Sequence, residues 1–170
     1  MFFLYNLLIS FFLLISPIIF IFRICLGKED FERINEKYTL YKKTNSPEIN
    51  IWFHGASVGE INSILPIVKS LERRNDIKRI LLTSTTLSSA YVVSKSNLKK
   101  TRHIYFPIDF NFFSKRFVNI WKPNIAIFVD SEIWPNMITS LKNSKIPIIL
   151  INARITEKSF KRWRIINNFS

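Results

Sequence analysis

The sequence predicts an α/β protein, in which a Rossmann-like parallel sheet covered by helices is preceded by an N-terminal transmembrane helix. From residue 49 onward, short apolar runs alternate with segments whose apolar residues recur every 3.6 residues, which is typical of a parallel sheet with helical crossovers. The first 22 of the 170 residues carry no charged side chain. We therefore expect a membrane anchor helix at 1–22, a polar connector at 23–48 and a Rossmann-like domain at 49–170.

The first 22 residues are long and apolar enough to cross a membrane. Eighteen of them are apolar, and a helix of this length extends about 33 Å, close to the thickness of a hydrocarbon core of about 30 Å. The run starts without Lys or Arg and lacks a small-residue cleavage site, which disfavours a signal peptide. Basic residues follow it, beginning with Arg23 and Lys28. This asymmetry predicts a single-pass anchor with the globular part in the cytoplasm, the alternative being an ordinary buried helix.

The elements of the domain follow from the apolar runs and from the residues that interrupt them. A breaker at Ser46-Pro47 ends the connector, and Pro107 and Pro123 end a strand and a helix. Strands are expected at 49–54, 79–83, 103–106, 124–129 and 147–151. Helices are expected after the turn at 55–59 and at 87–95, 110–121 and 134–144, with a basic helix beyond residue 156.

Charge and composition limit the partners. The formal net charge of +13 lies entirely after the anchor, which predicts anionic partners, and near an anionic membrane each Lys or Arg contributes about 1 kcal/mol. No nucleic-acid-binding motif accompanies the charge, so we expect no nucleic-acid partner. The single cysteine excludes an internal disulfide, and no paired His or Cys spacing predicts a metal site.

Chemistry in such a sheet is expected at the carboxyl ends of the strands, where the strand order reverses. In the usual order 3-2-1-4, the first and fourth strands are neighbours. The loop with Glu60 and the loop with Asp130, Ser131 and Glu132 are then predicted to flank one crevice.

The Gly55–Gly59 turn has three interpretations. Its G-x-S-x-G pattern fits a hydrolase nucleophile elbow, but such an enzyme places Asp or Glu and then His after the serine, and neither histidine, His54 or His103, follows Asp130. Its spacing does not fit a dinucleotide fingerprint. Ser57 and Glu60 also form a capping box, which gives Glu60 a purely structural explanation. His54 and Trp134 likewise have structural explanations, as a hydrogen-bonded strand-end histidine and as core packing.

Five strings together point to a family. They are Trp52-Phe53-His54-Gly55-Ala56-Ser57-Val58-Gly59-Glu60, Thr83-Ser84-Thr85-Thr86, Pro107-Ile108-Asp109, Asp130-Ser131-Glu132-Ile133-Trp134-Pro135-Asn136 and Asn152-Ala153-Arg154-Ile155-Thr156. Taken in this order, they resemble the 3-deoxy-D-manno-octulosonic acid (Kdo) transferases of lipopolysaccharide synthesis. The resemblance covers the whole chain, including the apolar helix, but corresponds to the amino-terminal half of that family.

The resemblance implies the N-terminal, acceptor-side domain of a GT-B glycosyltransferase at the cytoplasmic face of the inner membrane. In that family a second Rossmann-like domain, which this sequence does not include, holds most of the donor site. The implied reaction transfers Kdo from CMP-Kdo to a lipid A precursor, with inversion at the sugar and with no metal or other cofactor.

The resemblance also implies roles for individual residues. Glu60 matches the general base, and Asp130 or Glu132 is its expected carboxylate partner, although the family usually has Glu where this chain has Asp130. The remaining matches, expected to be acceptor-side or supporting residues, are Ser57, Gly59, Asn136 and Arg154. The basic side chains suit a bisphosphorylated acceptor.

Two readings from other classes stay open. The first is a remnant of a split or truncated gene, inactive alone or dependent on a separate C-terminal donor-domain polypeptide. The second is a basic membrane-surface binding module that has no activity.

Overall fold

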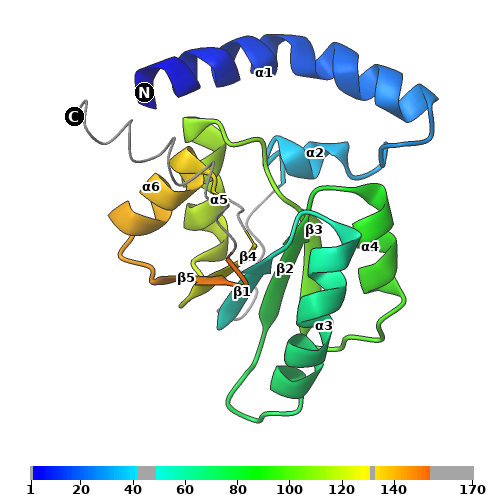
Figure 1. The fold of residues 1–170 in the computed structure, drawn as a ribbon, viewed down its shortest axis with the longest axis vertical. Helices are drawn as coiled ribbons and strands as arrows, with labels where there is room; N and C mark the ends of the chain where they lie inside the picture. The colour runs from blue at the N-terminus through cyan, green and yellow to red at the C-terminus, as the bar shows by residue number, and fades with distance from the viewer. Residues whose placement is uncertain (1, 42–48, 131–132, 154–170) are drawn as a thin grey trace.

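The domain is built on a five-stranded parallel sheet (Figure 1). We describe residues 2–41, 49–130 and 133–153 of a computed structural model of the chain. The strands are β1 (Ile51–His54), β2 (Ile80–Ser84), β3 (Thr101–Tyr105), β4 (Ala126–Val129) and β5 (Ile148–Ile151). Their order is β3-β2-β1-β4-β5, so the predicted neighbours β1 and β4 do pair, with His54 opposite Phe128.

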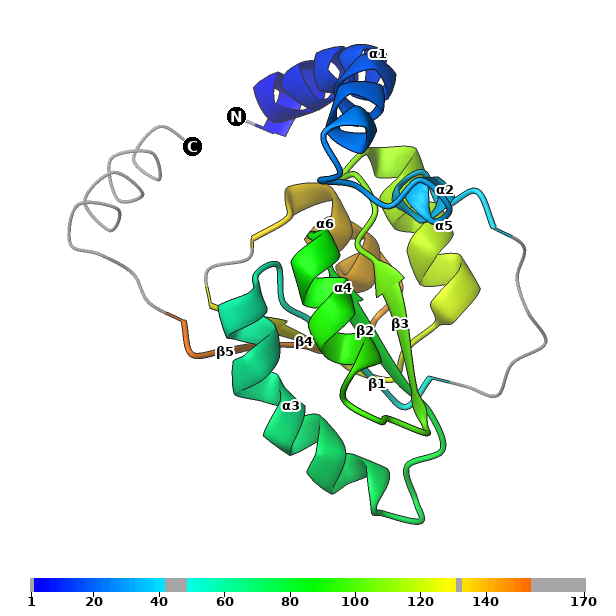
Figure 2. The same cartoon turned by 90° about the vertical axis from the view of Figure 1, so that its right-hand side faces the viewer.

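Helices cover both faces of the sheet (Figure 2). They are α3 (Val58–Glu72), α4 (Leu87–Ser94), α5 (Asn111–Trp121) and α6 (Pro135–Asn143). Because alternate strand residues point to opposite faces, Trp52 packs with α5 and α6, whereas Phe53 packs with α3 and α4. Two apolar cores thus hold three layers together.

The predicted elements are confirmed with small shifts at their ends. The largest shifts are of two residues: the first and fourth strands begin at Ile51 and Ala126 rather than at 49 and 124, and the third begins at Thr101 rather than at 103. The α3 helix continues through Pro66, whose side chain lies on the exposed face of the helix. The basic helix expected beyond residue 156 falls outside the described residues.

The N-terminal apolar run forms one long helix, α1 (Phe2–Cys25), which contains Pro17. Within the described residues it is the one helix long and apolar enough to cross a membrane, by length and composition. It runs across one end of the domain, above α5 and α2 (Figure 1).

The segment predicted as a polar connector is docked on the domain as far as Tyr41, before residues 42–48, which are outside the described part. It contains the short helix α2 (Ile34–Lys37), which protects the edge strand β3. Glu36 Oε2 accepts a hydrogen bond from the Tyr105 N–H (2.8 Å), and Arg33 donates to the His103 carbonyl (3.0 Å). These contacts satisfy backbone groups that an edge strand would otherwise expose.

Candidate functional site

The Glu60 carboxylate lies at the N-terminus of α3, directly after β1. Its Oε2 accepts a hydrogen bond from the Ala56 N–H (2.7 Å), and its Oε1 accepts one from the Ser57 hydroxyl (2.7 Å). Ser57 in turn caps the helix by accepting from the Glu60 N–H (3.3 Å). The predicted capping box therefore forms, with Ser57 as the N-cap. The Glu60 carboxylate accepts from the N–H of Ala56, one residue before the N-cap. An ionised carboxylate has about four lone-pair sites, so two remain for a substrate hydroxyl.

The loop that holds Glu60 is braced by the loop after β2. The Ala56 carbonyl accepts hydrogen bonds from Thr85 Oγ1 (2.9 Å) and from Ser89 Oγ (3.3 Å). Gly55 permits the close approach of the loop to the helix, because a Cβ there would lie 3.1 Å from the Glu60 Cβ. A Cβ at Gly59 would meet only Ser57 Oγ, at 3.8 Å. The structure thus gives a steric reason for Gly55 rather than for Gly59.

Asp130 follows β4 and belongs to the neighbouring strand end. Its backbone has a positive φ of 56°, a conformation that Asp adopts more easily than Glu. This is a local reason why Asp stands here in place of the Glu that the resemblance led us to expect. The Asp130 carboxylate accepts a hydrogen bond from the Asn152 amide, whereas the donors to the Glu60 carboxylate are Ala56 and Ser57. Glu132 and Arg154 lie outside the described residues.

Asn136 is buried and supports the fold around the site. Its Nδ2 donates to the Asp109 carbonyl (2.6 Å), and its N–H donates to Asp109 Oδ2 (3.0 Å). The Met137 N–H donates to Asp109 Oδ1 (2.8 Å). Because these two amides open α6, the Asp109 carboxylate caps that helix from another loop. Tyr5 of α1 also donates to Asp109 Oδ2 (2.6 Å).

A cavity of about 350 Å³ lies between α1 and the carboxyl ends of the strands. Its lining includes Ile9 and Phe12 from α1 and Thr85, Asp109 and Trp134 from the strand-end loops. Lys37 also lines it: its ammonium is buried, pairs with Glu29 Oε1 (2.6 Å) and donates to the Thr85 carbonyl (3.2 Å). Burial lowers the pKa of Lys37, and the Glu29 carboxylate opposes this shift.

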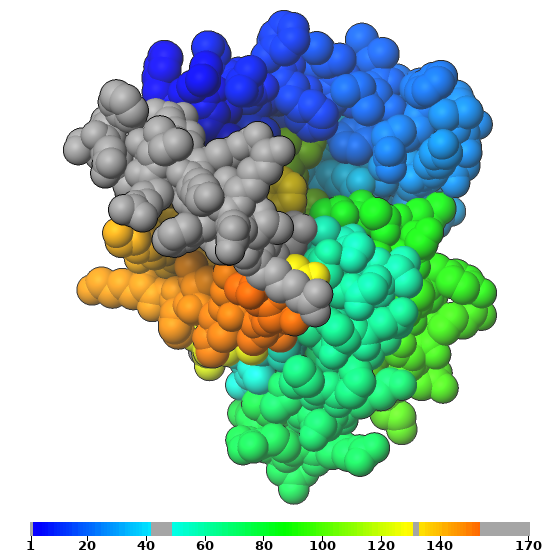
Figure 3. Space-filling model, in the orientation of Figure 1, coloured from blue at the N-terminus to red at the C-terminus, as the bar shows by residue number. Residues whose placement is uncertain are grey.

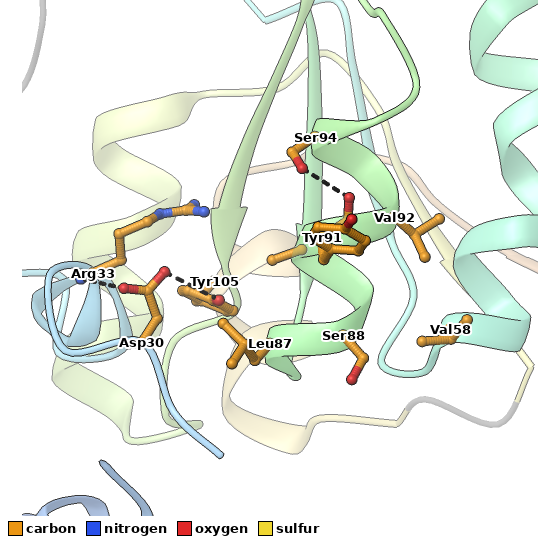
Figure 4. Close-up of a pocket in the computed structure, with 10 residues that line it drawn as sticks. Asp30, Arg33, Val58, Leu87, Ser88, Tyr91, Val92, Ser94 and Tyr105 are labelled. Atoms are coloured by element: carbon orange, nitrogen blue, oxygen red, sulfur yellow. Dashed lines mark hydrogen bonds between the residues drawn. The ribbon is translucent and has the colours of Figure 1, made fainter. Parts of the chain in front are cut away.

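A second cavity, of about 690 Å³, lies between α4 and the segment before α2 (Figure 4). Asp30 and Arg33 form one side of it and Tyr91 the other, and Val58 places it beside the start of α3. The Tyr91 ring is exposed. An acid, a guanidinium and an exposed aromatic ring beside the Glu60 loop are groups that can bind a hydroxyl-rich ring.

The two histidines are structural. His54 is buried, its Nδ1 lies 2.9 Å from Thr83 Oγ1, and its ring stacks on Phe106. His103 Nε2 lies 2.9 Å from Ser84 Oγ. The Ser57 hydroxyl donates to the Glu60 carboxylate, whereas the serine of a hydrolase elbow donates to a histidine. Among the described residues, no three His, Cys, Asp or Glu side chains gather as metal ligands.

The structure therefore brings Glu60 and Ser57 together, places Asp130 directly after the adjacent strand β4, and packs Asn136 against Asp109. Sequence reasoning gave no role to Asp109, Thr85 or Lys37. Asp109 and Thr85 lie within the strings that carry the family resemblance, and their place in those strings is the signal by which they could have been found.

Comparison with known proteins identifies the family. Residues 32–170 match the family described as "3-Deoxy-D-manno-octulosonic-acid transferase (kdotransferase)". A 3-deoxy-D-manno-octulosonic acid transferase of Rickettsia bellii is 37% identical over 168 residues, which cover 92% of this chain and 40% of the relative. A probable mitochondrial 3-deoxy-D-manno-octulosonic acid transferase of Arabidopsis thaliana is 34% identical, covering 88% of this chain and 34% of the relative.

A third relative, the 3-deoxy-D-manno-octulosonic acid transferase of Rickettsia typhi, is 30% identical, covering 96% of this chain and 46% of the relative. The chain thus spans less than half the length of each of these three glycosyltransferases. With its parallel sheet and its motif order, the chain belongs to the 3-deoxy-D-manno-octulosonic acid transferase family and corresponds to that family's N-terminal domain.

Proposed function

We propose that this chain is the acceptor-side half of a transferase that moves Kdo from CMP-Kdo to a lipid A precursor at the cytoplasmic face of the inner membrane. The observation that carries the proposal is the Glu60 carboxylate, fixed at the carboxyl end of β1 by two short hydrogen bonds and still able to accept a third. The donor-binding half belongs to further polypeptide, either the rest of a longer protein or a separate partner.

Glu60 acts as the general base in the proposed reaction. It accepts the proton of the attacking acceptor hydroxyl while the hydroxyl oxygen bonds to the anomeric carbon of Kdo. The bond from that carbon to the phosphate oxygen of CMP breaks, CMP leaves with the electron pair, and the sugar inverts. The residues assigned to the reaction need no metal or other cofactor. Asp130, with Glu132 as the second candidate, supplies negative charge from the adjacent strand end.

The acceptor is a phosphorylated glycolipid, and two features suit it. The cavity beside α4 presents the exposed Tyr91 ring next to the Glu60 loop, and the chain carries a net charge of +13. Ser57 and Gly59 shape the turn that the acceptor approaches, and Arg154 is the further basic candidate. The apolar helix α1 holds the domain at the membrane that contains the acceptor.

Two substitutions separate the base from the helix cap, in a fusion of this chain with the remainder of the Rickettsia bellii relative. Glu60→Gln keeps a side chain that serves at the third helical position but removes the base. We expect Kdo transfer to fall about a hundredfold or more, with little change in melting temperature. Transfer at the unsubstituted rate would remove Glu60 from the mechanism.

Ser57→Ala is the matched control in the same fusion. It removes the N-cap, which costs about 1 kcal/mol, and one of the two hydrogen bonds to the carboxylate, but it keeps the base and its hydrogen bond from the Ala56 N–H. We expect a lower melting temperature with most of the transfer rate retained. A folded Ser57→Ala protein without activity would instead point to Ser57 as the reacting group.

The second candidate is a chain that has no activity of its own. The chain covers 40% of the Rickettsia bellii transferase, and a GT-B site is a cleft between two domains. The downstream reading frame discriminates the two: coding sequence for the second domain supports a split or longer enzyme, and its absence supports the remnant.

A further inference from the structure

Helix α1 makes contacts along almost its whole length, with the domain at Asp109 and with the docked segment after the helix at Tyr38 and Glu29. Near its start the Tyr5 hydroxyl donates to Asp109 (2.6 Å), in its middle Ser16 Oγ lies 2.8 Å from the Tyr38 hydroxyl, and near its end Arg23 Nε donates to Glu29 (3.0 Å). At 1.5 Å per residue, the contacts from residue 5 to residue 23 extend over about 27 Å. The docked length is therefore close to the thickness of a bilayer core.

The helix has two faces that follow the 3.6-residue period. The face toward the domain carries Ser16 and Phe20, both buried, together with the partly buried Tyr5. The opposite face consists of large apolar side chains, of which Phe3 is 82% exposed and Leu14 is 78% exposed. Its other members are Leu7, Phe11, Ile18, Ile21 and Phe22. All the polar contacts to the domain thus come from one face.

We propose that α1 lies in the plane of the membrane, with its exposed apolar face in one leaflet and its other face on the domain. The space-filling view shows α1 lying along one end of the molecule, over the domain (Figure 3). An apolar face of this size marks contact with lipid or with protein. Lipid is the occupant that fits, because the exposed face of α1 is made of large apolar side chains and the remainder of the chain carries +13, which attracts anionic headgroups.

The exposed apolar surface continues beyond the helix. Phe31, before α2, is 72% exposed, and Leu40, after it, is 63% exposed. Both side chains line a groove of about 340 Å³ between α1 and α2, together with Ile21 and Ile24. The segment after α1 thus extends the lipid-facing surface.

The docked helix and a spanning helix exclude each other. In a perpendicular helix Tyr5 would lie about 27 Å from Arg23 along the membrane normal, near the opposite headgroups. Asp109, which is 1% exposed within the domain, would then lose the Tyr5 hydroxyl, and Tyr38 would lose Ser16. An in-plane helix keeps all three contacts.

The in-plane arrangement places the strand ends next to the headgroups. The cavity of about 350 Å³ is lined on one side by Ile9 and Phe12 of α1 and on the other by Thr85 and Trp134. The inference rests on the docking of α1 and not on the proposed reaction, so loss of Kdo transfer would leave it standing.

Depth measurements on the exposed face test the proposal. In a Cys25→Ser background, nitroxide labels are placed on the full chain at Phe3→Cys, Phe11→Cys, Ile18→Cys and Phe22→Cys, in vesicles of phosphatidylethanolamine and phosphatidylglycerol. Relative accessibility to oxygen and to a nickel chelate reports the depth of each label. We expect four similar depths, about 5–10 Å below the headgroup boundary. Lys28→Cys, an exposed site after the helix, supplies the aqueous reference.

Three results would overturn the proposal. A profile that is deepest at Phe11→Cys and shallow at both ends would show a spanning helix. Labels with the water accessibility of the Lys28→Cys reference would show that the face has no lipid contact. Spin–spin broadening between labels, together with low accessibility to both reagents, would show that a second copy of the chain covers the face.

Discussion

At the scale of single residues, the Asp109 carboxylate joins three elements. It accepts hydrogen bonds from Tyr5 of α1, from two N–H groups that open α6, and from Ser114 of α5 (3.1 Å). Every one of these donors faces a carboxylate group that is shielded from water. Such hydrogen bonds contribute more than neutral ones, because the charge strengthens each of them.

Replacing Asp109 should therefore destabilise the whole arrangement. Asp109→Asn turns one acceptor oxygen into a donor that faces backbone N–H groups, and we expect the free energy of unfolding to fall by about 3 kcal/mol. Denaturant titration in detergent measures the change. Tyr5→Phe is the matched control, since it removes only the α1 contact and should cost about 1 kcal/mol. Equal losses for the two variants would contradict the capping role of Asp109.

His103 predicts how stability depends on pH. Burial, and next the neighbouring Arg33 guanidinium, lower the pKa of His103 from 6.5 to about 3. Between pH 6.5 and pH 3 the unfolded chain then binds a proton that the folded chain does not, so stability rises with pH in this window. From pH 7 down to pH 4 this group should remove about 3 kcal/mol from the free energy of unfolding.

The His103→Gln variant isolates that contribution. Gln has no titrating group in this range, so the unfolding free energy of the variant should depend less steeply on pH between 4 and 7. Urea midpoints of both proteins at several pH values provide the comparison. The comparison uses the slope of the unfolding free energy against pH and not its absolute value, because Gln also changes the hydrogen bond to Ser84. Parallel curves for the two proteins would refute the prediction.

At the scale of elements, the turn between β1 and α3 decides where Glu60 points. Gly55→Ala would bring a methyl group to 3.1 Å from the Glu60 Cβ and 3.4 Å from Ile61 Cδ1. The helix start must then move by a few tenths of an ångström, and we expect a lower kcat for Kdo transfer in the two-domain fusion. Kinetics at saturating substrate measure this effect.

Gly59→Ala is the counterpart with room for its side chain. Ala is favoured over Gly in a helix by about 1 kcal/mol, so we expect a more stable protein. Unchanged transfer would show that the glycine serves no contact. A stable variant with a raised KM for the acceptor would show that substrate approaches the backbone at Gly59.

Most of the sheet and its helices could be predicted from sequence because the signals are local. The apolar run before Gly55 and the period that continues through Ile61 identify β1 and α3 without any knowledge of the rest of the chain. The order of the strands followed from a general rule for α/β sheets. The position of Glu60 in the first turn of α3 could be predicted because the turn after β1 sets it.

The docked parts could not be predicted in the same way. From the sequence, Glu29 and Lys37 would be expected on the solvated surface. In the structure they are buried, because each neutralises the charge of the other although eight residues of chain separate them. Asp109 reaches α6 over 27 residues, and Tyr5 reaches Asp109 over 104. These contacts form only once the sheet has placed the loops side by side, so no local sequence pattern predicts them.

At the scale of the whole molecule, the chain alone should not transfer Kdo, because the proposed donor site lies in the second domain. Purified chain is incubated with CMP-Kdo and a lipid A precursor, and product is measured by mass spectrometry. Addition of the remaining part of the Rickettsia bellii relative, in trans or as a fusion, should restore turnover. Turnover by the isolated chain at the rate of a complete relative would show that one domain is sufficient.

The bridge from Tyr5 to Asp109 has a practical consequence for anyone preparing a water-soluble form. Trimming residues 1–22 would strip a phenol from a carboxylate that caps α6, and would open the cavity lined by Phe106 and Trp134 to solvent. Such a shortened protein is a poor template for inhibitor screening, because its pocket lacks a wall. Ligands selected against the intact chain would reach this pocket only if they also bind the lipid interface.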